Sequence, residues 1–234
     1  MANCLWPRVS RVSRFYYCMM RLPLVLLMLT ALFSPTRAVT QTVADSGTYF
    51  VRHGTDTVAT ERFQRTPTRL EGTLAIRNST RTSERWVAVI GPDATLPLIE
   101  ITVREGTDSA GGKAKVTERA RVIFKDDSAA VDAVGGSGIQ TRLFGTQSGA
   151  LPYLNLSFAL LEQAVRRARV APEHKHIPFF NLGGGQTVTA RLSPLGSDSL
   201  LLEIGSVRYH LLVDAEGRVM GGRIPAQNVV VDRQ

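Results

Sequence analysis

The sequence predicts a mainly β protein of the α+β class, a strongly curved or nearly closed antiparallel sheet with one long helix packed against it. Three observations support this fold class. Apolar and polar residues alternate with a period of two along most of the chain, a single segment has helical spacing, and no further helices separate the strands. Because parallel strands need long crossover connections, a sheet without them is largely antiparallel.

The alternation is clearest in two long segments. In residues 96–104, Ile99 and Ile101 fall on one face and polar residues on the other, and residues 113–125 alternate in the same way. Such strands pack one face on a core and expose the other to water. Shorter alternating runs occupy residues 48–53, 57–65, 69–77, 85–90, 129–134 and 140–144, and then 177–181, 187–192, 199–204, 207–213, 218–224 and 228–231.

The helical spacing is confined to residues 151–170, where apolar residues recur at intervals of three and four. We expect the helix to occupy residues 151–169, with Pro152 in its first turn and Ser148 or Gly149 as its cap. Arginines in its last turn favour the helix dipole. The apolar stripe consists of Leu154, Phe158, Leu161, Val165 and Ala168.

Residues 1–38 are typical of a secretory signal peptide. Arginines precede the apolar stretch 22–33, and small residues up to Ala38 form a cleavage site. The apolar stretch is too short to span a bilayer. Because it is removed with the leader, we expect no integral membrane span in the mature protein. The sequence therefore predicts export to the periplasm or the extracellular space and a single β-rich domain over residues 39–234. Met19 or Met20 is an alternative start of translation. The alternative to a cleaved signal peptide is that this N-terminal segment stays attached as a membrane anchor.

Charge and cysteine content argue against several classes of function. The leader carries five arginines and no acidic residue, so it contributes +5 to the formal net charge of +8. No basic run suits a phosphate backbone, and we expect no nucleic-acid partner. Both cysteines, Cys4 and Cys18, lie in the leader, which leaves the mature domain without a disulfide or a thiol nucleophile.

The tripeptide Arg52-His53-Gly54 resembles the catalytic motif of the histidine phosphatases, which stands at the end of their first strand. The resemblance implies that His53 would attack phosphorus and Arg52 would bind the phosphate oxygens. That family continues with a helix and an alternating α/β order, whereas residues 57–65 alternate as a strand. We therefore expect a strand, a turn at Gly54 and a second strand, with a phosphohydrolase as the remote alternative.

Other candidate sites are explained by turns and loops. His174-Lys175-His176 has two histidines, possible metal ligands, on one strand face, but no third ligand at a recognisable spacing, and we expect a solvated loop. Gly183-Gly184-Gly185 precedes a strand rather than a helix, so it predicts a hairpin turn and no phosphate site. We expect no catalytic residue, no metal, no cofactor and no enzymatic activity.

The first hairpin of exported bacterial proteins of unknown function resembles an opening pattern of this chain, made of Tyr49, Val51, Gly54, Val58, Glu61 and Phe63. Residues 212–219 followed by Ile224-Pro225 are similar to the ending of those proteins. In architecture these proteins resemble the outer-membrane lipoprotein carriers. In those carriers a curved sheet and a helix enclose an apolar cavity for acyl chains. The resemblance implies binding or scaffolding, and no catalysis.

Several strands are apolar on both faces, notably residues 200–202 and 177–180. A sheet with one solvent-exposed face does not need apolar residues on both faces of a strand, whereas a sheet curled around a helix or a ligand does. We expect a hydrophobic ligand, an acyl chain or an apolar peptide, to bind between sheet and helix. The alternative is a core filled by the helix alone, in a structural or accessory interaction module. The expected ligand-binding residues are Leu154, Phe158, Leu161, Phe179, Leu200 and Leu202.

Expression of the full chain in a bacterial host tests the leader. We expect a soluble exported product whose intact mass corresponds to loss of residues 1–38, because a signal peptidase recognises the small residues that end at Ala38. A product that retains Met1 and sediments with the membrane fraction would contradict this expectation.

Overall fold

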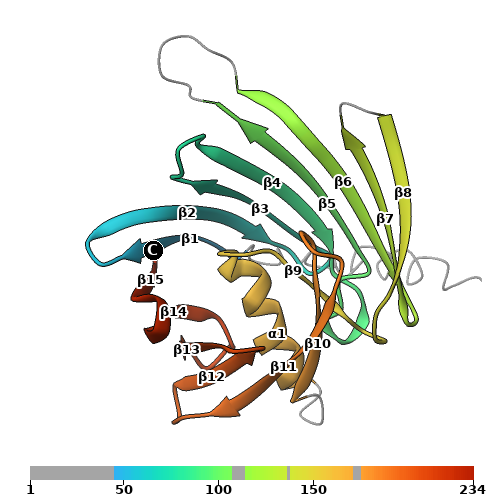
Figure 1. Cartoon of the computed structure of the whole chain (residues 1–234). Coiled ribbons are helices and arrows are strands. Elements are labelled where there is room, and N and C mark those ends of the chain that lie inside the picture. Colours follow the sequence, from blue (N-terminus) through green and yellow to red (C-terminus); the bar gives the residue numbers. More distant parts are fainter. Residues whose placement is uncertain (1–44, 107–113, 136–137, 171–174) are drawn as a thin grey trace, which may run out of the picture. The chain divides into compact units, whose positions relative to one another are not determined.

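A computed structural model describes residues 45–106, 114–135, 138–170 and 175–234. The chain divides into two compact units, Met1–Gln41 and Thr42–Gln234, and all described residues belong to the second unit. The expected leader, residues 1–38, lies outside the described residues. The second unit contains one extended sheet and one α-helix (Figure 1).

The helix is α1 (Phe158–Val170). Two short 3₁₀ turns, η1 (Pro92–Ala94) and η2 (Pro225–Gln227), begin at prolines. The strands are β1 (Asp45–His53), β2 (Asp56–Arg65), β3 (Arg69–Ile76), β4 (Thr82–Val89), β5 (Leu98–Glu105), β6 (Lys115–Lys125), β7 (Ser128–Gly135), β8 (Gly138–Gly145), β9 (Leu151–Tyr153), β10 (His176–Asn181), β11 (Thr187–Pro194), β12 (Ser199–Ile204), β13 (Val207–Val213), β14 (Val219–Ile224) and β15 (Val229–Arg233).

The strands form a single 15-stranded sheet in the order β8-β7-β6-β5-β4-β3-β2-β1-β15-β14-β13-β12-β11-β10-β9. Two meanders, β1–β8 and β10–β15, are joined in the middle of the sheet where β1 pairs with β15. All neighbours are antiparallel except β9 and β10, which α1 connects as a parallel pair. The sheet ends at β8 and β9 without closing and bends around α1 (Figure 1), which confirms the predicted fold class.

The start of the helix differs from the prediction. Residues 151–153, expected in its first turn, form the edge strand β9, and Pro152 pairs in register with Phe180. Leu156 has a left-handed backbone, with φ of 66°, which interrupts any helix at that point. The apolar spacing of Leu154 continued the helical stripe in the sequence, but pairing with β10 makes residues 151–153 a strand, and Leu154 follows that strand outside any helix.

The core lies between α1 and the concave face of the sheet. Close packing there leaves room only for glycine at one position of β3. Trp86 of β4 is fully buried and crosses over Gly72 of β3, its register partner. A Cβ atom built on Gly72 would lie 2.5 Å from Cζ2 of the Trp86 indole. The strand can therefore carry no side chain at this position unless the indole moves.

Replacing Gly72 with alanine should lower the free energy of unfolding by about 1–3 kcal/mol, because a clash with a buried ring forces repacking. Urea denaturation of the folded domain measures the change. Thr73→Ala, on the exposed face of the same strand, is the matched control and should change it by less than about 0.5 kcal/mol. Equal stability of the Gly72→Ala variant and the unmodified protein would contradict this packing.

Candidate functional site

The N-terminus of α1 is fixed by a residue from a distant strand. Ser157 caps the helix, since its carbonyl oxygen accepts from the amide of Leu161 at 3.3 Å and its Oγ from the amide of Leu160 at 3.4 Å. The buried carboxylate of Glu61, on β2, accepts from Ser157 Oγ at 2.5 Å and from the amide of Ala159 at 2.9 Å. Glu61 therefore holds the first turn of the helix against the sheet.

Burial raises the pKa of the Glu61 carboxyl to about 7 from its ordinary value of 4.5. The donors from Ser157 and Ala159 act in the opposite direction, and the nearby carboxylate of Glu162 raises the pKa slightly further. The side chain consequently changes its protonation state near neutral pH.

A second buried carboxylate fixes the middle of the helix. Glu162 is fully buried, and its oxygens contact Arg166 Nε at 2.8 Å, a terminal nitrogen of Arg233 at 3.0 Å and one of Arg65 at 3.4 Å. It also accepts from the amide of Val219 at 2.9 Å. These partners come from α1 itself, β15, β2 and β14, so one side chain ties the helix to three strands.

Asp45 and Tyr49, both on β1, complete this cluster. Asp45 bridges Arg166 and Arg233, with each contact at 2.6 Å. The Tyr49 hydroxyl lies 2.9 Å from the carboxylate of Glu162, and burial together with that carboxylate raises the pKa of Tyr49. Buried charges of this kind are tolerated because each has an opposite charge and hydrogen-bond partners.

Four of the six expected ligand-binding residues are buried in the core. Phe158, Leu161, Phe179 and Leu202 are each no more than 2% exposed. The ring of Phe158 packs at 5.8 Å from that of Tyr49, measured between centroids. These side chains fill the space between helix and sheet with one another.

The other two expected residues lie at the margin of the core. Leu154 and Leu200 are half-buried and pack against it. Leu200 also lines a recess of about 180 Å³ beside the C-terminal half of α1, together with Val165 and Leu192. The structure therefore does not bring all six residues into one cavity.

A pocket of about 270 Å³ with a mixed polar and apolar lining lies instead at the far side of the concavity, between β6–β8 and the hairpin that joins β10 to β11. We call it the concave-face pocket. Its floor includes the rings of Phe144 and Phe180, whose centroids are 5.7 Å apart in an edge-to-face arrangement. Its lining residues are Glu118, Val131, Ala133, Gln140, Arg142, Phe144, Phe180, Leu182 and Gly183–Gly185.

The hairpin turn forms one wall of this pocket without side chains. A Cβ atom on Gly185 would lie 2.5 Å from Cε1 of Phe144, and Gly185 has a φ of +69°. Glycine is required here both for the turn and for the approach to the ring. The turn predicted at Gly183–Gly185 is thus confirmed, and it contributes to the pocket. Glu118, Gln140 and Arg142 are exposed and supply a polar rim.

Sequence reasoning missed most of the concave-face pocket. The apolar character of residues 177–180 on both strand faces did indicate that Phe180 is buried. Val131 and Phe144 lie in strands whose apolar and polar residues alternate, with one face towards the core and the other towards water. Nothing in the local sequence distinguishes these two residues from ordinary core residues. Only the packing of the hairpin over β8 brings them together.

The tripeptide Arg52-His53-Gly54 forms the predicted strand, turn and strand. His53 ends β1 and is exposed, and Gly54 turns the chain with a φ of +59°. Arg52 forms an ion pair with Asp232 of β15 at 3.0 Å, so its guanidinium is already engaged.

The remaining candidate ligands do not converge. Across the residues that the structure describes, no group of three or more His, Cys, Asp or Glu side chains could hold a metal ion. His176 is exposed at the start of β10, while His174 falls outside the described residues. In the same part of the chain no helix has both the length and the apolar content to cross a bilayer.

Comparisons with known proteins give one structural likeness. No family model matches the chain, and no curated protein matches it. Among solved structures, a DUF1089 family protein from Pseudomonas aeruginosa is similar at 13% sequence identity and a TM-score of 0.49. The alignment covers 74% of this chain and 92% of that protein.

The raised pKa of Glu61 predicts how stability depends on pH. The folded state retains this proton up to about pH 7, whereas the unfolded chain loses it near pH 4.5, so stability should fall as pH rises between these values. The loss should be about 3 kcal/mol, and Glu61→Gln, which does not titrate, should remove it.

Urea denaturation at several pH values between 4 and 8 measures this dependence. Glu100→Gln, at a carboxylate that is 60% exposed, is the control and should keep the pH profile of the unmodified protein. A Glu61→Gln profile that follows that of the unmodified protein would show that Glu61 does not titrate in this range.

Proposed function

We propose that the chain is an exported, non-enzymatic protein that binds a hydrophobic ligand, an acyl chain or an apolar peptide segment, in the concave-face pocket. The observation that supports this most is the recess beside the filled core, with the apolar rings of Phe144 and Phe180 as its floor and polar side chains at its rim. Ligand pockets are concave and mostly apolar, with a few polar groups that orient the ligand.

The size and rim of the pocket favour a narrow amphiphile. Its volume of about 270 Å³ is slightly below the usual range for drug-sized ligands, about 300–1,000 Å³, which suits one extended chain. Arg142 and Gln140 stand at the rim and can donate hydrogen bonds to a polar head group. The apolar chain would then pack on the rings below.

The ligand would lie in another place than it does in the lipoprotein carriers. In both kinds of protein, a curved sheet surrounds a helix. Here the space beneath α1 is filled by side chains such as Phe158 and Leu161. The ligand would therefore lie on the β6–β8 side of the concavity.

The second candidate function is a structural or accessory interaction module without a ligand. The tight burial of Phe158, Leu161, Phe179 and Leu202 supports it, because these residues leave the helix–sheet interface filled. A phosphohydrolase centred on His53 remains the remote alternative, and the engagement of Arg52 by Asp232 counts against it.

Displacement of a fluorescent fatty-acid probe tests ligand binding, together with mass spectrometry of lipids extracted from the purified protein. Ala133→Trp should fill the pocket and weaken probe binding at least tenfold, because the indole occupies the volume of the chain. Ala130→Trp, which lies on the opposite face of the same strand, is the matched control and should bind like the unmodified protein.

Two results would contradict the proposal. One is the absence of both a co-purifying lipid and probe binding, which would leave the accessory module. The other is probe binding that Ala133→Trp does not weaken, which would place the ligand elsewhere on the protein.

A further inference from the structure

A row of arginine and threonine residues crosses the outer face of the sheet, which is the other face from the one that holds the concave-face pocket. The strand register aligns Arg62 with Thr73, Thr73 with Arg85, Arg85 with Thr102, and Thr102 with Arg119. These residues come from five consecutive strands, β2–β6. We call them the arginine–threonine row.

The register gives the row a regular spacing. Neighbouring strands lie about 4.8 Å apart, so arginines on alternate strands repeat at about 9.6 Å, with a threonine hydroxyl between them. Arg104 lies on the same face, two residues beyond Thr102 in β5. It adds a further guanidinium beside Arg85.

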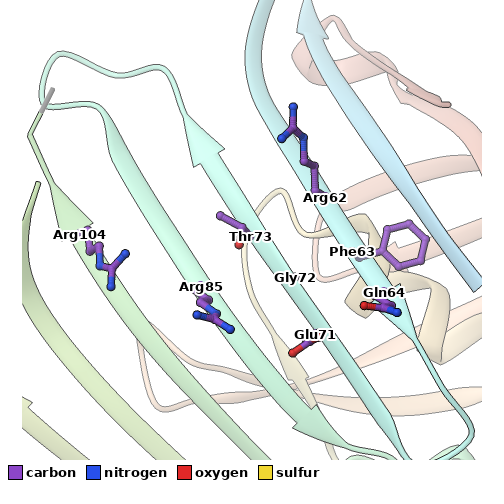
Figure 2. A pocket seen from close by; sticks show the side chains of 8 residues that line it. All are labelled: Arg62, Phe63, Gln64, Glu71, Gly72, Thr73, Arg85 and Arg104. Atoms are coloured by element: carbon purple, nitrogen blue, oxygen red, sulfur yellow. The ribbon is translucent and has the colours of Figure 1, made fainter. Parts of the chain in front are cut away.

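Part of the row surrounds a recess of about 460 Å³, shown in Figure 2. Arg62, Arg85 and Arg104 reach it from β2, β4 and β5, and Thr73 lies between Arg62 and Arg85. The recess therefore presents three cationic groups, a hydroxyl and the Gln64 amide to one ligand, beside a single carboxylate, Glu71, that Arg69 already pairs.

The described carboxylates Glu71 and Glu100 lie against arginines outside the row. On this face Glu71 pairs with Arg69 at 2.8 Å, and Glu100 approaches Arg121 at 3.9 Å. Within the described part of the chain, no carboxylate lies within ion-pair distance of the row's arginines or Arg104. By contrast, the buried arginines around Glu162 are all paired.

We propose that the arginine–threonine row binds a linear acidic polysaccharide that carries carboxylates at regular intervals. A guanidinium binds a planar carboxylate through two parallel hydrogen bonds, which an ammonium group cannot do. The threonine hydroxyls both donate and accept, as sugar hydroxyls require. A polymer with a matching repeat would engage alternate strands in succession.

Two other polyanions fit the face less well. Single-stranded nucleic acids bind through bases stacked on aromatic rings. Of the aromatic residues of β2–β6, Trp86 and Phe124 belong to the core side of the sheet, and Phe63, which borders the recess, is buried with its ring stacked on Tyr49. A bilayer is flat, whereas the row follows the bend of the sheet (Figure 1). A flexible chain can follow that bend.

Titration of the purified protein with polyuronate oligosaccharides at low salt, followed by calorimetry, tests the proposal. The triple variant Arg62→Gln, Arg85→Gln, Arg119→Gln should bind about a hundredfold more weakly, since removing one solvent-exposed ion pair weakens binding by up to about a factor of five. The control triple Arg191→Gln, Arg208→Gln, Arg223→Gln removes the same charge from β11, β13 and β14 and should bind like the unmodified protein.

Replacing the same three arginines with lysine distinguishes binding through paired hydrogen bonds from binding through charge alone. The lysine triple keeps the charge but cannot form the paired hydrogen bonds, so it should bind about tenfold more weakly than the unmodified protein. Each variant's urea midpoint shows that it is folded, and these exposed positions should leave that midpoint unchanged.

Four outcomes would overturn the proposal: no polyuronate binding at low salt, equal weakening by the control triple, full binding by the lysine triple, or tighter binding of single-stranded DNA or anionic phospholipid vesicles. The last result would assign the row to nucleic acid or to a membrane surface. Weakening confined to the row variants would support the proposal.

Discussion

The buried carboxylate of Glu162 is the contact on which the placement of the helix depends. A charge in this position must be compensated by opposite charges, and its partners Arg65 and Arg233 come from different strands. The helix can bring Glu162 into contact with both arginines in only one position, over the junction of β1 and β15. The concavity is consequently filled on that side and remains open towards β6–β8.

The alternation of apolar residues was enough to predict the sheet, and the lone helical stripe was enough to predict a helix within it. The first residue of the helix could not be predicted, because it depends on Glu61, whose contact with Ala159 spans 98 residues of sequence. Local spacing allowed residue 151 as a start. A tertiary contact and the pairing of β9 with β10 selected Phe158.

Expected and observed pocket residues differ for a related reason. Apolar residues on both faces of a strand indicate that both faces are covered, and this is true of β10, where the neighbours Phe179 and Phe180 are both buried. The pattern does not say whether a side chain or a ligand provides the cover. The concave-face pocket and the arginine–threonine row both require the register between strands, which no single strand's composition encodes.

The pairing of β1 with β15 has a consequence for how the chain reaches its folded state. Asp45 and Arg233 meet across 188 residues of sequence, although most other strand pairs are formed by neighbours in the chain. Each meander can form from local contacts, but the seam between them needs β1 and β15, which are far apart in the sequence. Until the seam forms, the hairpin of β1 and β2 has an unpaired edge, and the Glu162 cluster lacks Arg233. Completion of the sheet and burial of the helix are therefore late, coupled events.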